Sequence, residues 1–130
     1  MIILLNMAKA IICALAAALI LKIFVFDFMV AHGHSMEPAI PNGTILVVSR
    51  LHYGFRLPWR QTYLVRWATP RLGDVVVFYT PMGELAVKRF AAMVGDDKFL
   101  AKGDNSLQSF DSRAYGPVPI ENIIGKVLWH

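Results

Sequence analysis

The most pronounced pattern along the chain is an N-terminal run of apolar residues. Almost every position from 10 to 30 is apolar, and only Lys22 and Asp27 interrupt the run. About twenty apolar residues are needed for a helix to span the hydrocarbon core of a bilayer. The pattern therefore predicts a single transmembrane helix that starts somewhere between residues 2 and 10, with Lys22 extending toward one membrane interface.

A cleaved secretory signal is the alternative for this segment, because small residues suited to cleavage lie at positions 14–18. Apolar character nevertheless continues beyond them through Phe24, Phe26 and Met29. We therefore favour an uncleaved membrane anchor over residues 1–30, followed by a separate domain over residues 31–130.

The remaining chain has the short apolar runs and turn signals of a β domain. Residues 45–49, 72–79, 84–90 and 120–129 are each expected to form a strand, and Pro-Asn-Gly or Pro-Met-Gly turns precede two of them. No segment after residue 31 shows a long helical period. The pattern predicts a mainly β fold carried on one N-terminal helix.

Composition adds two limits to this picture. The chain has 130 residues, of which 56% are hydrophobic, so that one compact domain beside the anchor is the expected organisation. The single cysteine, Cys13, lies inside the apolar run, which excludes a disulfide framework and a cysteine-based metal site.

The net charge of +4 is concentrated between Glu37 and Asp74, where no other acidic residue occurs. Within this stretch, residues 50–71 form what we call the Arg/aromatic segment, in which arginines are interleaved with aromatic residues: Arg50, Tyr53, Phe55, Arg56, Trp59, Arg60, Tyr63, Arg66, Trp67 and Arg71. Such interleaving occurs in nucleic-acid binding, but the motifs of the common nucleic-acid modules are missing. Beside a membrane anchor, we favour contact with lipid headgroups over a nucleic-acid site or a plain solvated loop.

Ser35 is the candidate nucleophile. It lies in Gly33-His34-Ser35-Met36-Glu37-Pro38, directly after the anchor. A serine in such a short pattern is by itself an ordinary turn residue, so the assignment needs a base.

Lys88 is the candidate base. Strand alternation places it on the same face as Ala86 and Phe90, where desolvation favours the neutral amine that can accept a serine proton. An ordinary solvent-reaching lysine is the alternative. The four histidines, His32, His34, His52 and His130, are expected at the surface and are poorer candidates.

A polar cluster near the C-terminus could orient such a lysine. It comprises Gly103-Asp104-Asn105 followed by Ser109, Asp111, Ser112 and Arg113. It offers a hydroxyl to orient an amine and a carboxylate–guanidinium pair to brace the loop; a polar surface loop with Asx turns is the alternative.

Four segments, taken in order, resemble one family. They are the Ser35 motif; Gly73-Asp74-Val75-Val76-Val77-Phe78; Val87-Lys88-Arg89 with Val94-Gly95-Asp96; and Gly103-Asp104-Asn105-x3-Ser109-x-Asp111-Ser112-Arg113-x2-Gly116-x-Val118-Pro119. This set, which runs from about residue 20 to the C-terminus, is similar to type I signal peptidases. These are membrane-anchored Ser/Lys endopeptidases that remove signal peptides from exported proteins.

The resemblance implies a fold and a set of roles. The fold is an antiparallel β catalytic domain on a single transmembrane helix. Ser35 would be the nucleophile and Lys88 the general base, with a Ser35 backbone N–H donating to the oxyanion. Ser109 would orient the Lys88 amine, while Asp104, Asp111 and Arg113 would support the site. The substrate would pair with two extended segments, Phe28, Met29, Val30 and Ala31 on one side and Leu85, Ala86, Val87 and Lys88 on the other.

Three departures from relatives matter. Some members carry a serine as an oxyanion donor where this chain has Gly33. Many insert strands or a cap between the segments that here are joined by residues 97–102 alone, so we expect the cap domain to be largely absent. Another branch has histidine where Lys88 stands, and residues 53–58 resemble bacterial rather than mitochondrial members, which favours a bacterial origin.

The resemblance also implies a setting. The expected substrates are signal peptides with small residues at positions −1 and −3, and the other expected partners are the lipid bilayer and the protein-export translocon, with no nucleic acid. The catalytic domain is expected on the extracytoplasmic side of the cytoplasmic membrane, and no metal or organic cofactor is implied. The alternatives are a peptidase of the same fold dedicated to one substrate, such as a pilin, and a membrane-tethered binding module without activity.

Overall fold

The computed structural model describes residues 1–57, 59–60 and 62–130; Pro58 and Gln61, within the Arg/aromatic segment, lie outside the described residues. Two helices, nine strands and a 3₁₀ turn occur in the described part of the chain: α1 (Ile2–Phe24), β1 (Phe26–Val30), β2 (Ile45–Ser49), β3 (Gly54–Phe55), β4 (Val65–Arg66), β5 (Val75–Tyr79), β6 (Leu85–Val94), β7 (Lys98–Lys102), α2 (Ser112–Tyr115), β8 (Val118–Pro119), η1 (Ile120–Asn122) and β9 (Ile123–Trp129). A mainly β fold with one N-terminal apolar helix is thereby confirmed.

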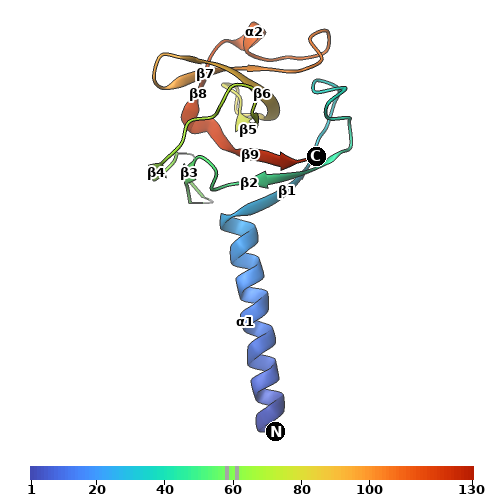
Figure 1. Cartoon of the computed structure of the whole chain (residues 1–130), viewed down its shortest axis with the longest axis vertical. Coiled ribbons are helices and arrows are strands. Elements are labelled where there is room, and N and C mark those ends of the chain that lie inside the picture. Colours follow the sequence, from blue (N-terminus) through green and yellow to red (C-terminus); the bar gives the residue numbers. More distant parts are fainter. Residues whose placement is uncertain (58, 61) are drawn as a thin grey trace.

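Helix α1 stands apart from the β domain (Figure 1). It has 23 residues, none of them buried by the rest of the protein, and Lys22 lies in its last turn. At 1.5 Å per residue this is about 34 Å, enough to cross a hydrocarbon core of ~30 Å. By length and composition α1 can span a membrane.

The helix ends earlier than the expected anchor boundary at residue 30. Residues 26–30 form β1, which pairs along its whole length with β2 in antiparallel register, from Phe26 with Ser49 to Val30 with Ile45. The aromatic and β-branched residues of this segment suit a strand, and the ion pair of Asp27 with Arg50 ties it to the domain at 2.7 Å.

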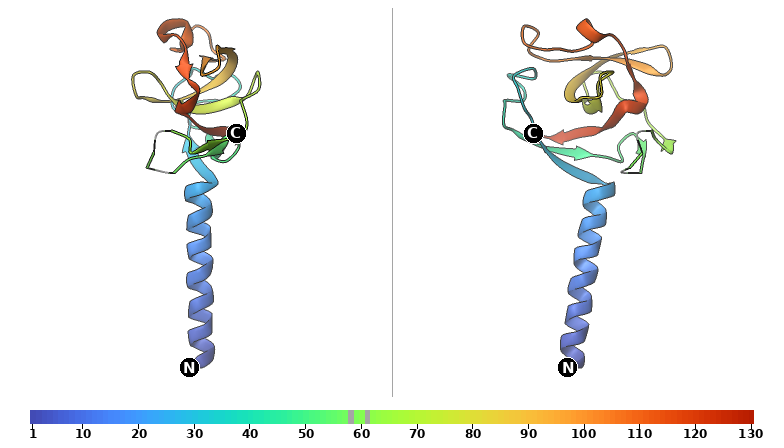
Figure 2. Two further views of the ribbon diagram at one scale, coloured as in Figure 1. Left: turned by 90° about the vertical axis from the view of Figure 1, so that its left-hand side faces the viewer. Right: turned by 180° about the vertical axis from the view of Figure 1, so that it is seen from behind.

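Seven strands form one antiparallel sheet in the order β1-β2-β9-β5-β6-β7-β8. The C-terminal strand β9 lies between β2 and β5, so it joins the two N-terminal strands to the rest of the sheet. The sheet curls strongly (Figure 2) and encloses two groups of buried apolar residues. One group is centred on Phe78, Phe90 and Phe99, and the other on Leu46, Val48 and Val77.

Strand β6 has two different halves. Residues 85–89 pair with β5, whereas β7 joins only from Arg89 onward, opposite Lys102. Residues 85–88 therefore have a free edge on the side that β7 occupies farther along. Only the turn at residues 95–97 separates β6 from β7, so no cap domain is inserted there.

Strands β3 and β4 form a separate two-stranded sheet within the Arg/aromatic segment. The ring of Phe55 on β3 stacks on Phe24 at the end of α1, with centroids 6.1 Å apart. This contact holds the segment at the level where α1 enters the domain (Figure 1).

Candidate active site

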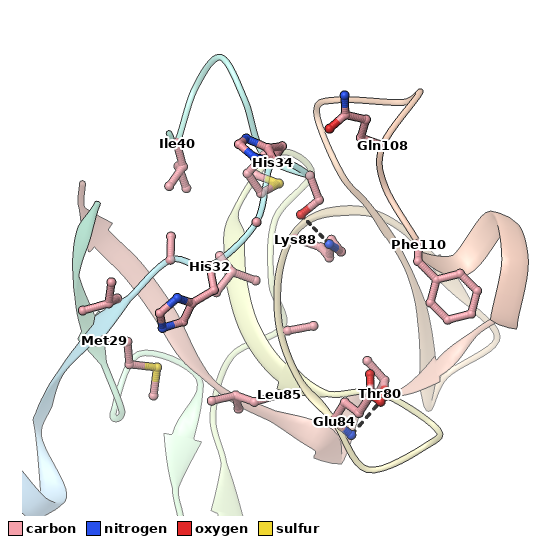
Figure 3. A pocket seen from close by; sticks show the side chains of 17 residues that line it. Met29, His32, His34, Ile40, Thr80, Glu84, Leu85, Lys88, Gln108 and Phe110 are labelled. Carbon is pink, nitrogen blue, oxygen red and sulfur yellow. Dashed lines mark hydrogen bonds between the residues drawn. The ribbon is translucent and has the colours of Figure 1, made fainter. Parts of the chain in front are cut away.

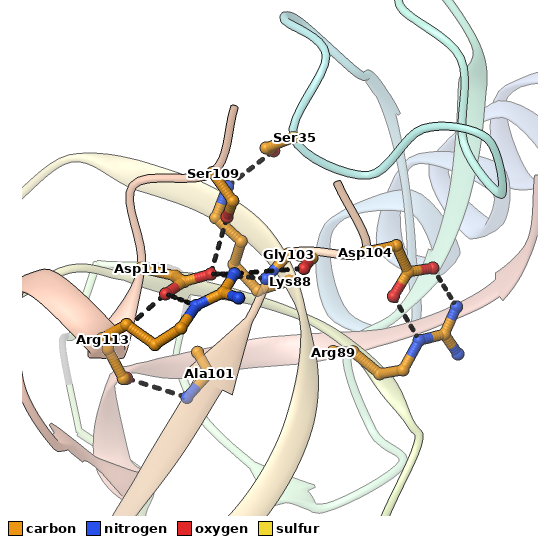
Figure 4. Close-up of polar contacts among 10 residues, drawn as sticks. Ser35, Lys88, Arg89, Ala101, Gly103, Asp104, Ser109, Asp111 and Arg113 are labelled. Carbon is orange, nitrogen blue, oxygen red and sulfur yellow. Dashed lines mark hydrogen bonds and ion pairs between the residues drawn. The ribbon is translucent and has the colours of Figure 1, made fainter. Parts of the chain in front are cut away.

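Ser35 and Lys88 meet although 53 positions separate them. The Lys88 Nζ lies 2.6 Å from the Ser35 Oγ, within hydrogen-bond distance (Figure 4). Lys88 is on β6, and its partner lies in the turn that follows β1. The pair has the geometry that proton transfer from a serine hydroxyl to an amine requires.

Lys88 is buried, with 7% of its surface exposed. Burial lowers the pKa of its amine; the negative charge of Asp111 acts in the opposite direction, and Arg113 adds to the lowering. Desolvation disfavours the ammonium form, so a larger fraction of Lys88 is neutral near neutral pH than for an exposed lysine.

The turn that carries Ser35 is held from both sides. Before it, Gly33 has φ +89°, in the left-handed region that favours glycine, and its N–H donates to the Asn42 side chain at 2.9 Å. After it, Met36 and Ile40 are buried and pack into the core beside β2. A serine at position 33 would strain this backbone conformation.

Among the described residues, no histidine forms a hydrogen bond with the Ser35 hydroxyl. His34 pairs with Glu37, three positions along the same turn. His32 lines the groove beside the site, and His52 packs edge-to-face on Tyr53. The Ser35 hydroxyl oxygen accepts a hydrogen bond from the Lys88 Nζ.

Asp111 is the centre of the supporting network and is fully buried. Its carboxylate accepts hydrogen bonds from the Gly103 N–H at 2.8 Å, from the Ser109 hydroxyl at 2.7 Å and from the Arg113 side chain at 2.6 and 3.0 Å. Burial alone would raise the pKa of this carboxyl, but the bonds from Arg113, Gly103 and Ser109 outweigh burial and lower it well below its usual range. Asp111 is therefore a fixed negative charge beneath the site.

Ser109 was expected to bond to the Lys88 amine, and in the structure its hydroxyl donates to Asp111 instead. Because the donated proton faces Asp111, the oxygen lone pairs remain available to an amine. An orienting role toward Lys88 stays a prediction.

Gly103 lies between the parts of the site. A Cβ built on it would come within 2.1 Å of the Ser109 Oγ and 2.6 Å of the Ser35 carbonyl oxygen. Only glycine lets the loop after β7 approach both. Gly103 belongs to the Gly103-Asp104-Asn105 motif noted in the sequence, but nothing in the neighbouring residues predicted this close packing.

Asp104 forms a bidentate pair with Arg89. The Arg89 Nε and Nη2 lie 2.8 and 2.7 Å from the two carboxylate oxygens. Arg89 follows Lys88 on β6 and points to the other face, where Nη1 also donates to the Gly73 carbonyl at 2.8 Å. The pair fixes the loop after β7 to the strand that carries the base.

Asn105 was not among the expected site residues. Its backbone N–H donates to the Ser35 carbonyl at 2.8 Å, and its side-chain amide donates to the His34 carbonyl at 3.0 Å. These contacts join two loops that are 70 positions apart. The sequence therefore did not predict them, although Asn105 lies next to the expected site residue Asp104.

An apolar-lined groove of about 440 Å³ opens at the Ser35–Lys88 pair (Figure 3). Residues 29–31 line it on one side and residues 85–88 on the other, and Gln108 and Phe110 lie beyond Lys88. Of the expected substrate-flanking residues, Phe28 is not in the groove lining; it is 62% exposed, on the strand face opposite Met29. Both lining segments have an unpaired strand edge, because β1 ends the sheet and β7 does not reach residues 85–88.

The family whose sequence model matches is described as "Signal peptidase, peptidase S26", with residues 4–97 and 94–130 matched. The two matches meet at the β6–β7 turn. The chain is similar to "Probable signal peptidase I-1" of Synechocystis (26% identity, covering 89% of this chain and 76% of the relative). It is also similar to "Signal peptidase I" of Pseudomonas aeruginosa (29%, covering 95% and 42%) and to "Mitochondrial ATP-independent inner membrane protease subunit 1b" of Arabidopsis thaliana (28%, covering 76% and 66%).

The alignment with the Synechocystis protein runs over 161 positions, more than the 130 residues of this chain. That relative therefore carries additional residues within the matched region. The chain spans less than half of the Pseudomonas protein.

Proposed function

Because the chain belongs to the signal peptidase family, peptidase S26, we propose that it is a membrane-anchored serine endopeptidase that removes signal peptides from exported preproteins. The observation that carries the proposal is the 2.6 Å contact of the Ser35 hydroxyl with a buried lysine amine. A hydroxyl beside a desolvated amine, in a groove with two free strand edges, suits acyl transfer from a bound peptide.

The reaction would proceed in two halves. The Ser35 Oγ attacks the scissile carbonyl while its proton passes to the neutral Lys88 Nζ, and the Ser35 N–H donates to the resulting oxyanion. The C–N bond then breaks, and Lys88 returns the proton to the leaving amine, which leaves an ester on Ser35. Water, deprotonated by Lys88, attacks this ester; the C–O bond to Ser35 then breaks, Lys88 gives the proton to the Ser35 Oγ, and the acid product leaves and loses its own proton to solvent.

Substrate binding would use the free edges of β1 and β6. An extended peptide lying between residues 29–31 and residues 85–88 can hydrogen-bond to the backbone on both sides. Such bonds bind any sequence, so selection falls to the side-chain pockets. Met29, Ala86 and Val87 contribute to a mostly apolar lining, which fits small residues at positions −1 and −3.

The bilayer is the second proposed partner, with the domain on its extracytoplasmic side, where exported chains leave the translocon. Phe26, Phe28 and Val30 alternate on the exposed face of β1, and their cross-strand neighbours include Ile45. In the Arg/aromatic segment Leu64, Val65 and Trp67 are also exposed, beside Arg66. Apolar and aromatic residues with arginines, at the end of a membrane-length helix, suit the headgroup region of an anionic leaflet.

Cleavage of a labelled preprotein by the full chain in detergent, with the cut site determined by mass, tests the proposed function. Ser35→Ala and Lys88→Ala should each lower kcat at least about 10³-fold, because each removes one half of the reacting pair. Ser106→Ala and Lys102→Ala, in the same region, are the matched controls and should retain activity. Full activity in Lys88→Ala would refute the pairing of serine and lysine.

The same assay separates the alternatives. Cleavage of several unrelated preproteins indicates a general role, whereas cleavage of one indicates a dedicated peptidase. A membrane-tethered binding module predicts a wild-type protein that cleaves none of them and whose Ser35 is not acylated by a serine-reactive probe.

A further inference from the structure

We propose that Asn105 is a positioning residue that aims the Ser35 N–H at the oxyanion formed during cleavage. The inference rests on the proposed function, in which Ser35 attacks a carbonyl. It is carried by two hydrogen bonds from Asn105 to the peptide groups on either side of the serine.

The first step of the argument concerns the peptide group between His34 and Ser35. In a planar trans peptide the C=O and the N–H point in opposite directions. The Asn105 side-chain amide donates to the His34 oxygen at 3.0 Å, and the Glu37 N–H donates to the same oxygen at a longer 3.2 Å, so Asn105 makes the shorter of the two bonds that hold this end of the group. Holding the oxygen end sets the direction of the Ser35 N–H at the other end.

The second step concerns the following peptide group. The Asn105 backbone N–H donates to the Ser35 carbonyl at 2.8 Å. With both flanking carbonyls held by one residue, the backbone of Ser35 has little freedom to rotate. A hydrogen bond to the His34 carbonyl also polarises its peptide group, which makes the Ser35 N–H a stronger donor.

The Ser35 N–H itself has no hydrogen-bond partner among the residues that the structure describes. The nearby Gly33 N–H, by contrast, is occupied by the Asn42 side chain at 2.9 Å. Because position 33 carries no hydroxyl, the Ser35 N–H has to supply a large share of oxyanion stabilisation, and its direction matters correspondingly more.

Asn105 is in turn held by its neighbours. Asp104 is bound by Arg89, which follows Lys88 on β6, and the Gly103 N–H is bound by Asp111. The three-residue segment 103–105 thus fixes the nucleophile turn relative to the strand that carries the base.

The test compares Asn105→Ala with wild type in full-chain preprotein cleavage, with kcat and KM measured across a pH series. Asn105→Ala keeps the backbone bond to Ser35 and removes the side-chain bond. We expect kcat to fall about 10- to 100-fold with KM within about twofold, since the loss of an entire oxyanion donor costs about 10²- to 10³-fold. The pH at which activity is half-maximal should not move, because Asn105 is uncharged and its hydrogen bonds among the described residues do not involve Lys88. Inhibition by a peptide aldehyde, whose adduct with Ser35 resembles the tetrahedral intermediate, should weaken by a factor similar to the fall in kcat.

Asn122→Ala is the matched control. Asn122 also donates its side-chain amide to a backbone carbonyl, that of Tyr79 at 2.9 Å, away from Ser35. Should Asn105→Ala fail to fold, the comparison moves to Asn105→Asp, which lacks the donor, and Asn105→Gln, which retains an amide and should be at least tenfold more active.

Two results would overturn the inference: a kcat for Asn105→Ala equal to that of Asn122→Ala, or a loss of activity that comes with a shifted pH profile, which would place the effect on the base. In the fallback pair, equal activity of the Asp and Gln variants would do the same. A wild-type protein that cleaves no preprotein overturns the proposed function as well, so the two failures are distinguishable.

Discussion

The mechanism proposed for Ser35 and Lys88 requires a lysine that is neutral when substrate binds. An exposed lysine is almost fully protonated at pH 7 and cannot accept a proton. In this protein the amine is buried against an apolar strand face, and burial is the main cause of its lowered pKa. The charge of Asp111 raises the pKa of Lys88, but this carboxylate is also bonded to Arg113, Ser109 and the Gly103 N–H. The effect of burial is larger, so the pKa of Lys88 is lowered overall.

The pH dependence of cleavage should follow from this burial. As pH falls through the lowered pKa of Lys88, the amine gains a proton and can no longer serve as a base, so kcat/KM should fall. Above that pKa it should level off. A series of kcat/KM values against pH, with Lys102→Ala as the control, measures the midpoint. A midpoint near the ordinary lysine value of about 10.4 would contradict the argument.

At the scale of elements, strand β6 and the loop after β7 build the site together. β6 carries Lys88, keeps a free edge for a peptide and presents Arg89 on its other face. The loop brings Gly103, Asp104 and Asn105 against Arg89 and the Ser35 turn. Lys88 and Ser35 are far apart in the chain. The loop after β7 contacts both the Ser35 turn and Arg89 on β6, and so it links the two segments.

Gly103→Ala should disturb this assembly. The added methyl would meet the Ser109 Oγ at 2.1 Å and the Ser35 carbonyl oxygen at 2.6 Å, so the loop has to move away. Overpacking of this kind costs about 1–3 kcal/mol of stability, and we expect kcat to fall at least about tenfold. Thermal unfolding and preprotein cleavage measure the two effects, with Ser106→Ala as a control in the same loop. Wild-type kcat in Gly103→Ala would contradict the close packing.

At the scale of the whole molecule, we propose that one end of the domain faces the membrane. Helix α1 leads directly into β1, and β3 of the Arg/aromatic segment lies at the same end of the domain (Figure 1). β1 and this segment both carry exposed aromatic residues. The three tryptophans of the chain, Trp59, Trp67 and Trp129, are all well exposed. Exposed tryptophans at the end of a transmembrane helix are typical of an interfacial belt.

Tryptophan fluorescence therefore reports on membrane contact without a label. With the full chain in nanodiscs, lipids brominated close to the headgroup should quench a large part of the emission. Trp67→Phe and Trp129→Phe should each reduce the quenched part, which identifies the tryptophans in contact. Emission that brominated lipids leave unchanged would show that this end of the domain stands clear of the bilayer.

Much of the architecture followed from local patterns. The apolar run predicted α1, and strand patterns at residues 45–49 and 84–90 located β2 and much of β6. Ser35 and Lys88 could be proposed because their chemistry and the order of the surrounding motifs are written in consecutive residues. β7 was not predicted, and residues 26–30 were assigned to the anchor, because in a short apolar segment strand and helix patterns are hard to distinguish.

The sequence by itself thus determined the helix, the β class, the family resemblance and which serine and lysine are proposed to react. Only the tertiary structure decided the 2.6 Å contact of Ser35 with Lys88, the free edge at residues 85–88, the partner of Ser109 and the two bonds of Asn105. The physical reason is range. Propensity and burial patterns act between neighbours in the chain, whereas register and close approach of distant loops depend on how the whole sheet curls and packs.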